Sequence, residues 1–151
     1  MEYQKIVFLL ITISIGTILI ANQLQNQENF ATQVNNSGPH IGTNVPYSYG
    51  YDGSGIIISV IDTGVDFNHP DLFGFGMDGK IIGGYDFVDN DDMPEDTNGH
   101  GTQVIGIIAS NGNLKGIAPN SKILVYKVSE DGESVPTSMI IKAIKINRRW
   151  R

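Results

Sequence analysis

Two short segments of the sequence contain side chains whose types and positions could take part in catalysis. The first, "VIDTGVDFNHPDL" (residues 60–72), places Asp62 at the end of an apolar run, directly before Thr63 and Gly64. Open α/β sheets bind their ligands beyond the carboxyl ends of their strands, so this position favours a site role for Asp62. A buried, ionised carboxylate needs hydrogen-bond donors or a positive partner. The structural alternative is that Asp62 only caps the turn.

The second segment, "TNGHGTQVIGIIA" (residues 97–109), places His100 between Gly99 and Gly101. Glycine neighbours let other backbone approach closely and leave the imidazole uncrowded, and an apolar helix is expected to begin directly afterwards. The positive end of a helix dipole disfavours the imidazolium form, so we expect a neutral ring that accepts a proton as a general base. A lone histidine can also be purely structural, but Asp62 upstream and the two glycines favour catalysis.

An acidic loop, "DFVDNDDMPEDTNGHG", lies between these elements. It holds six carboxylates and no basic residue between positions 86 and 96, namely Asp86, Asp89, Asp91, Asp92, Glu95 and Asp96. Such a density of like charge repels itself unless solvent, salt or a hard cation neutralises it. Calcium accepts about six to eight oxygen ligands of this kind. The loop is therefore either a calcium site or a solvated acidic loop.

The pattern of apolar residues predicts the elements that position these side chains. Continuous β-branched runs at residues 54–62 and 121–129 are typical of strands buried on both faces, and residues 80–88 indicate a shorter strand. Residues 101–110 predict a buried helix. Residues 137–146 predict a second helix, with Thr137 or Ser138 as its N-cap. This order indicates an α/β fold with a mostly parallel sheet.

The length and composition of the chain indicate one domain that follows an export signal. The chain has 151 residues, a net charge of −6 and no cysteine, which argues against nucleic-acid binding and excludes disulfides and thiolate catalysis. Residues 6–21 are uncharged and apolar, so residues 1–21 are predicted to be a signal peptide or a signal anchor. The protein is then secreted, or membrane-associated through residues 6–21. Residues 22–44 are predicted to be a polar linker or short pro-segment, and residues 45–151 the folded domain.

Three stretches in order, "YDGSGIIISVIDTGVDFNHPDL", "NGHGTQVIGIIA" and "GIAPNSKILVYKV", resemble the subtilisin-like serine proteases, and in particular their thermitase-like members. The resemblance implies the N-terminal part of a three-layer α/β fold and endopeptidase activity on proteins or peptides. In the triad order Asp, His, Ser, for which subtilisin is a standard example, Asp62 would orient the imidazole and His100 would be the base. The resemblance also implies a calcium site at Asp86, Asp89 and Asp91.

Ser138, in "PTSMIIKAIKINRRWR", is the obvious candidate for a nucleophile, because "TSM" is similar to the "GTSMA" around the family's catalytic serine. That serine, however, follows a glycine and lies far downstream of the histidine, as does the oxyanion asparagine. Family members place their crossover helix directly after the strand that corresponds to residues 121–129, so the resemblance implies that Ser138 caps the N-terminus of that helix. The resemblance therefore predicts a truncated peptidase domain that carries the Asp and His but lacks the Ser and the oxyanion Asn.

Other functions fit the sequence less well. The "DTG" at Asp62 also occurs in aspartic proteases, but those need two copies and an all-β fold. No glycine-rich phosphate loop is present for a nucleotide-binding module. The remaining alternative is a catalytically inactive exported remnant, a calcium-binding fragment, or a half that docks with a separate remainder. An interrupted sheet of this kind should expose an unpaired strand edge.

Overall fold

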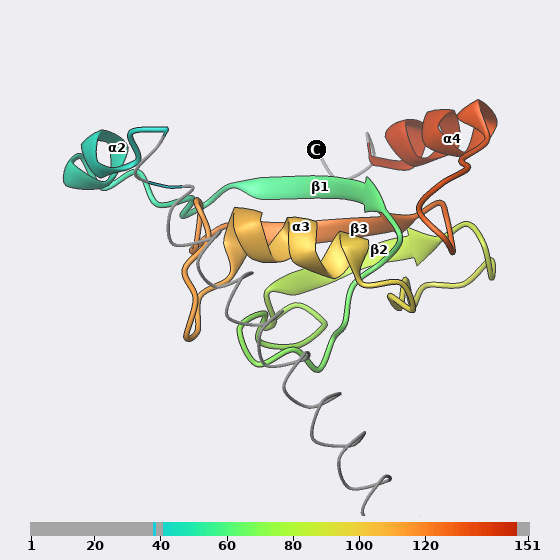
Figure 1. The fold of residues 1–151 in the computed structure, drawn as a ribbon, viewed down its shortest axis with the longest axis horizontal. Coiled ribbons are helices and arrows are strands. Elements are labelled where there is room, and N and C mark those ends of the chain that lie inside the picture. Colours follow the sequence, from blue (N-terminus) through green and yellow to red (C-terminus); the bar gives the residue numbers. More distant parts are fainter. Residues whose placement is uncertain (1–37, 39–40, 148–151) are drawn as a thin grey trace, which may run out of the picture.

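The computed structural model describes Gly38 and residues 41–147, so the predicted leader at residues 1–21 lies outside the described residues. One parallel sheet, with strand order β1-β3-β2, forms the centre of the described chain (Figure 1). Its strands are β1 (Ile57–Asp62), β2 (Ile81–Asp86) and β3 (Lys122–Lys127). The helices are α2 (Asn44–Ser48), α3 (His100–Ala109) and α4 (Thr137–Asn147). The predicted α/β fold is confirmed, and only the short α2 was not expected.

The central strand, β3, carries the core on both of its faces. Ile123 and Val125 pack on one face with Ile105 of α3. Leu124, Tyr126 and the following Val128 pack on the other face, with Ala143 of α4. Because side chains alternate along a strand, a strand covered on both faces is apolar throughout. The prediction of a doubly buried strand at residues 121–129 is therefore confirmed.

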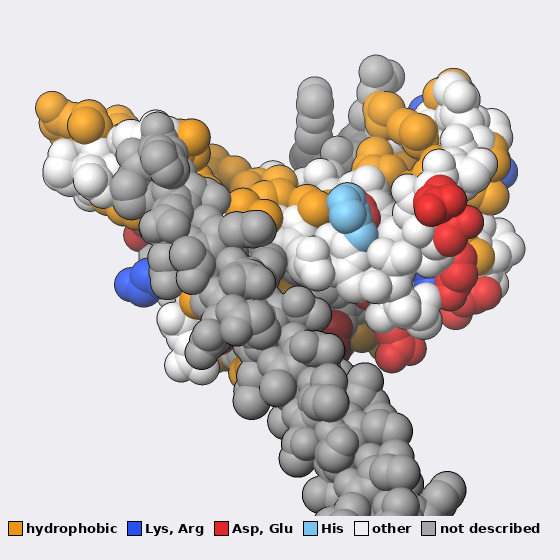
Figure 2. Space-filling model, viewed as in Figure 1, with side chains coloured by type: hydrophobic (Ala, Val, Ile, Leu, Met, Phe, Trp, Pro, Cys, Tyr) orange, Lys and Arg blue, Asp and Glu red, His pale blue; other side chains and the backbone are white. Residues whose placement is uncertain are grey.

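The edge strand β1 is less covered than its sequence predicted. Ile58 and Val60 pack toward α3, but Ile57 on the opposite face is 49% exposed. Among the described residues β1 pairs only with β3, so β1 is an edge strand of the described sheet. Figure 2 shows hydrophobic side chains along the upper edge of the molecule, from α2 toward α4. The sequence predicted that both faces of residues 54–62 are buried. This was wrong for the face that carries Ile57, which is half exposed.

The parallel register brings the functional end of the sheet together. Asp62 is the register partner of Lys127 in one strand pair, and Asp86 is the partner of the same lysine in the other. All three arrowheads in Figure 1 point to the end of the sheet where α3 begins and beside which α4 lies. The predicted site segments therefore meet at the carboxyl ends of the strands.

Among residues 41–147 no helix is long and apolar enough to cross a bilayer. The segment proposed for that role, residues 6–21, lies outside the described part of the chain.

Ile57→Lys should reduce self-association of the purified chain. A lysine on an exposed strand edge opposes edge-to-edge pairing and interrupts an apolar surface. Size-exclusion chromatography with light scattering, at matched concentration, measures the change. Met77→Lys is the control, because Met77 is also exposed but lies in the loop between β1 and β2. If both substitutions had the same effect, or if neither had any effect, a specific role for the β1 edge would be contradicted.

Candidate active site

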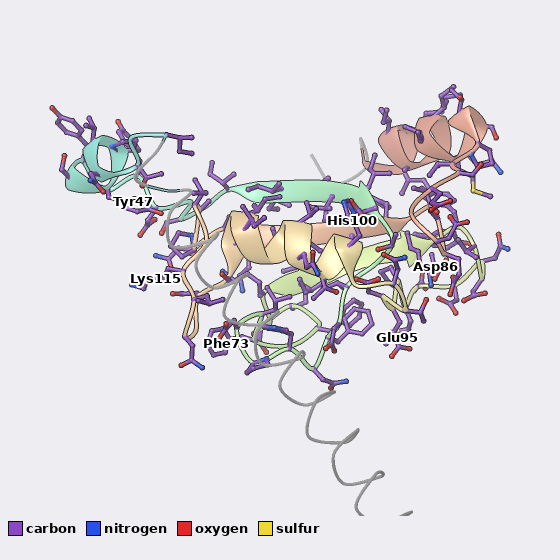
Figure 3. All side chains as sticks on the ribbon, in the orientation of Figure 1. Tyr47, Phe73, Asp86, Glu95, His100 and Lys115 are labelled. Carbon is purple, nitrogen blue, oxygen red and sulfur yellow. The ribbon has the colours of Figure 1, made fainter. Side chains whose placement is uncertain are left out.

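Asp62 and His100 meet where β1 ends and α3 begins. The ring Nδ1 of His100 lies 2.7 Å from Asp62 Oδ1, and the backbone amide of Thr63 donates to the same oxygen at 2.8 Å. The carboxylate is 15% exposed, whereas the imidazole is 62% exposed and faces outward (Figure 3). Because a carboxylate only accepts hydrogen bonds, Nδ1 carries the proton. In the neutral ring Nε2 is therefore a free acceptor, as a general base requires.

The pKa of His100 is raised from its ordinary value. The hydrogen bond to Asp62 is the main cause, followed by the negative charge of Asp62. Burial acts in the opposite direction, and the negative charge of Asp96 also raises the pKa. The direction is opposite to that expected from the helix dipole, so that expectation was wrong. A full charge at hydrogen-bond distance outweighs the partial charges at a helix end. The ring is thus a stronger base, and its neutral form becomes dominant only above the raised pKa.

The first turn of α3 is held by side chains from the preceding segments. The amide of His100 donates to Asn98 Oδ1 at 3.2 Å, and that of Gly101 donates to the Thr63 hydroxyl at 2.9 Å. The amide of Thr102 donates to Asp96 Oδ2 at 2.9 Å. These amides have no partner inside a helix, so side-chain acceptors must satisfy them. The position of His100 is therefore set by three polar residues that precede α3.

Asp96 is the centre of this network. Its Oδ1 accepts the Thr63 hydroxyl at 2.9 Å and the amide of Gly99 at 2.8 Å, and its Oδ2 also accepts the Thr102 hydroxyl at 2.5 Å. Burial by itself raises the pKa of Asp96, but the hydrogen bonds from Thr102, Gly99 and Thr63 together outweigh burial and lower it. The sequence interpretation counted Asp96 only as part of the acidic loop. Its place just before an expected helix start was the signal for a capping role.

The two glycines beside His100 act in different ways. Gly99 has φ of 102°, in the left-handed region that favours glycine. A Cβ on Gly101 would lie 2.3 Å from the carbonyl oxygen of Gly64, which is closer than atoms can approach. The predicted close approach of backbone is confirmed at Gly101, where α3 packs directly against the turn after β1.

A shallow groove of about 210 Å³ lies beside His100. Its lining also includes Asp62, Thr63, Ile61, Val128, Ser129, Gly132, Val135 and Ile140. A larger hollow of about 450 Å³ borders α3 and the loops before it, and includes Asp96 but not His100. The smaller groove is the one next to the chemistry, so we assign it, rather than the larger hollow, to the candidate site.

The structure does not bring Ser138 to the imidazole. No hydrogen bond joins Ser138 to His100 in the described part of the chain, and Ser138 is not among the residues that line the groove. The exposed Ser138 lies inside the first turn of α4, which begins at Thr137. The predicted capping role at Thr137 or Ser138 was therefore off by at least one residue. Ser129 lines the groove, but its hydroxyl donates to Asp131 and accepts from the Gly132 amide.

The proposed calcium ligands Asp86, Asp89 and Asp91 do not form a common donor set. Asp86 is 1% exposed, and its Oδ1 accepts the amides of Val88 at 2.7 Å and Asp89 at 3.0 Å. Asp91 turns its Oδ1 to the amide of Met93, at 2.8 Å. Within residues 41–147 no group of three or more His, Cys, Asp or Glu side chains is placed to hold a metal ion. The described side chains therefore do not fit the calcium site that the resemblance implied.

Known proteins with similar sequences identify the family of this chain. The model of the subtilase family matches residues 53–148, and the chain belongs to that family of serine peptidases. It is 40% identical over 130 residues to the minor extracellular protease Vpr of Bacillus subtilis, a match that covers 80% of this chain and 16% of Vpr. It is 46% identical over 87 residues to thermitase of Thermoactinomyces vulgaris, covering 55% of this chain and 29% of thermitase.

A solved structure shares the fold. The crystal structure of a cold-adapted subtilisin-like serine proteinase is similar with a TM-score of 0.54 and 40% sequence identity, and the match covers 63% of this chain and 32% of that one. The chain therefore spans about a third or less of the length of each of these three relatives.

Asp62→Asn should lower the pKa of His100 toward the ordinary histidine value. The asparagine keeps the shape of the side chain but removes the charge that favours the imidazolium form. The NMR titration of the His100 ring Cε1–H signal measures the change. An unchanged or raised His100 midpoint would show that Asp62 does not control the imidazole.

Asp96→Ala should destabilise the chain by roughly 2 kcal/mol at neutral pH, since several capped donors lose their acceptor. Asp92→Ala, in the same loop but exposed, should cost about 0.5 kcal/mol or less. Because the folded-state pKa of Asp96 is lowered, its stabilisation is present above the ordinary aspartate pKa and lost as the pH falls through the lowered value. Urea unfolding at neutral and acid pH measures both effects. Equal costs for the two variants would argue against the capping role.

Proposed function

We propose that this chain supplies the Asp–His part of a serine endopeptidase site. The observation that carries the proposal is the 2.7 Å contact between Asp62 and the Nδ1 of an outward-facing His100, at the carboxyl ends of parallel strands. Membership of the subtilase family supports the same reaction class. Similarity to the proteases Vpr and thermitase, at 40% identity over 130 residues and 46% over 87 residues, also supports it.

The proposed reaction uses His100 as a proton carrier. A serine oxygen attacks the carbonyl carbon of a peptide bond while Nε2 of His100 accepts the hydroxyl proton. Asp62 holds the ring orientation and stabilises the imidazolium that forms. Nε2 then returns the proton to the leaving amine, and the acyl group is later transferred to water. Proteins or peptides are the substrates, and the groove beside His100 has room for a substrate side chain.

The nucleophile in this proposal is not Ser138 or Ser129. Ser138 has no hydrogen bond to His100 among the described residues, and the Ser129 hydroxyl is engaged in its own turn. We infer that the serine and the oxyanion donors come from a segment that is not contained in the 151 residues. The exposed apolar side chains of β1 and α4 support docking of such a segment against these elements, among them Ile57, Ile141 and Ile144.

An exported, catalytically inactive remnant is the alternative function. It is favoured by the observation that no serine among the described residues forms a hydrogen bond with the His100 ring. Under both proposals the apolar segment at residues 6–21 directs the chain out of the cytoplasm, either secreted or membrane-anchored.

A fluorophosphonate probe, which reacts with activated serines, should not label the purified chain. We expect the same absence of labelling in the Ser138→Ala variant, as read by intact mass. A covalent adduct on Ser138 in the original chain, lost in Ser138→Ala, would overturn the proposal that the nucleophile lies elsewhere.

A chimera separates the two functions. Residues 53–147 are joined to the part of thermitase that follows its matching segment, and the folded product is treated with the same probe. The peptidase proposal predicts labelling that falls by at least about 10³-fold in rate for His100→Ala but not for Lys115→Ala, an exposed residue at the opposite end of the sheet (Figure 3). A folded chimera that does not react would support the inactive remnant.

A further inference from the structure

Lys127 occupies an unusual position for a lysine. It is the last residue of β3, and its side chain is only 2% exposed. Its Nζ donates to the carbonyl oxygen of Glu95 at 2.9 Å and to Glu130 Oε2 at 2.9 Å, and lies 3.7 Å from Asp86 Oδ2. The ammonium group therefore lies among oxygen atoms of the acidic loop, from Asp86 and Glu95, and of Glu130 after β3.

A buried ammonium is costly unless it is paired and hydrogen-bonded. Nζ of Lys127 meets this condition through its contacts with Glu95, Glu130 and Asp86. Its charge faces the acidic loop, which contains no basic residue of its own.

The partners of Lys127 are themselves fixed by the loop. The backbones of Asp86 and Asp91 pair with each other, and Asp86 Oδ1 holds the amides of Val88 and Asp89, so its Oδ2 is the oxygen that faces the lysine. On the other side, the Thr97 hydroxyl donates to Glu130 Oε1 and leaves Oε2 for Lys127. Two residues of the acidic loop, Asp86 and Glu95, thus contact this ammonium group.

We propose that the ammonium group of Lys127 is the built-in counter-cation of the acidic loop and stands in place of a calcium ion. Carboxylate and carbonyl oxygens, the ligands that calcium prefers, converge on Nζ instead. A metal ion cannot occupy the same volume, and the positive charge beside it repels a second cation. The loop therefore keeps its shape without calcium. This inference does not depend on the proposed catalytic function.

Calcium titration of the full chain tests the proposal directly. We expect no saturable binding in equilibrium dialysis with radioactive calcium up to millimolar concentration, and no change in thermal midpoint between calcium and EDTA. Saturable binding that is lost in Asp86→Asn would overturn the proposal, because it would show that Asp86 holds a metal ion despite Lys127. The dialysis result decides the question even for a chain that does not melt cooperatively.

Charge-removing variants test the role of the ammonium group itself. Lys127→Met keeps the aliphatic stem and removes the charge, so the urea midpoint should fall. Asp86→Asn removes one of the unpaired charges, so the further loss caused by Lys127→Met should be smaller in the Asp86→Asn background. The control is Lys122→Met on the same strand, whose Nζ donates to the Gly79 carbonyl instead. It should not couple to Asp86→Asn.

A role of Lys127 limited to packing predicts the same loss in both backgrounds, and that result would refute the counter-cation role. If Lys127→Met does not fold, Glu130→Gln replaces it in the cycle, because Glu130 is 55% exposed and its substitution removes only one partner of the ammonium group. Once that partner is lost, Lys127 depends more on Asp86. Asp86→Asn should then lower the midpoint more in the Glu130→Gln background than in the original chain, and equal losses would contradict the proposal.

Discussion

The hydrogen bond from the Thr63 hydroxyl to Asp96 joins the end of β1 to the start of α3, and the geometry of the candidate site depends on it. The same hydroxyl accepts the amide of Gly101, and the same carboxylate accepts the amide of Thr102. Both acceptors are needed because the first amides of a helix have no partner within it. With the helix start fixed to the strand end, the short contact between Asp62 and His100 follows from backbone placement.

Electrostatics at this end of the sheet are arranged by pairing within the chain. Asp62 raises the pKa of His100 through a direct hydrogen bond, while donors around Asp96 lower its pKa. Lys127 places a buried positive charge against Asp86 and Glu130. Each of these charges has a partner in a segment distant in sequence. The sequence of the acidic loop suggests a cation site, and the loop borders the ammonium group of Lys127 at the end of β3.

The described chain is well packed on one face of the sheet and partly open on the other. The α3 face holds a continuous core around Ile105 and Val125, whereas Ile57 on the other face remains half exposed. An open β1 edge and an exposed face of α4 are surfaces on which further chain can pack. This agrees with the fact that the chain matches a third or less of the length of each relative described above.

Local sequence determined a large part of this protein. The apolar runs located all three strands and both longer helices to within about three residues, and the glycines around His100 indicated a close approach that Gly101 makes. Local sequence also indicated Asp62 and His100 one by one as candidate site residues, and the family resemblance implied that they act as a pair. Only the tertiary structure decided the direction of the His100 pKa, the capping role of Asp96 and the position of Lys127 beside the acidic loop. The physical reason is that charges and hydrogen bonds act through space. The residues that set them come from different strands and loops, and one-dimensional patterns do not show which of them will meet.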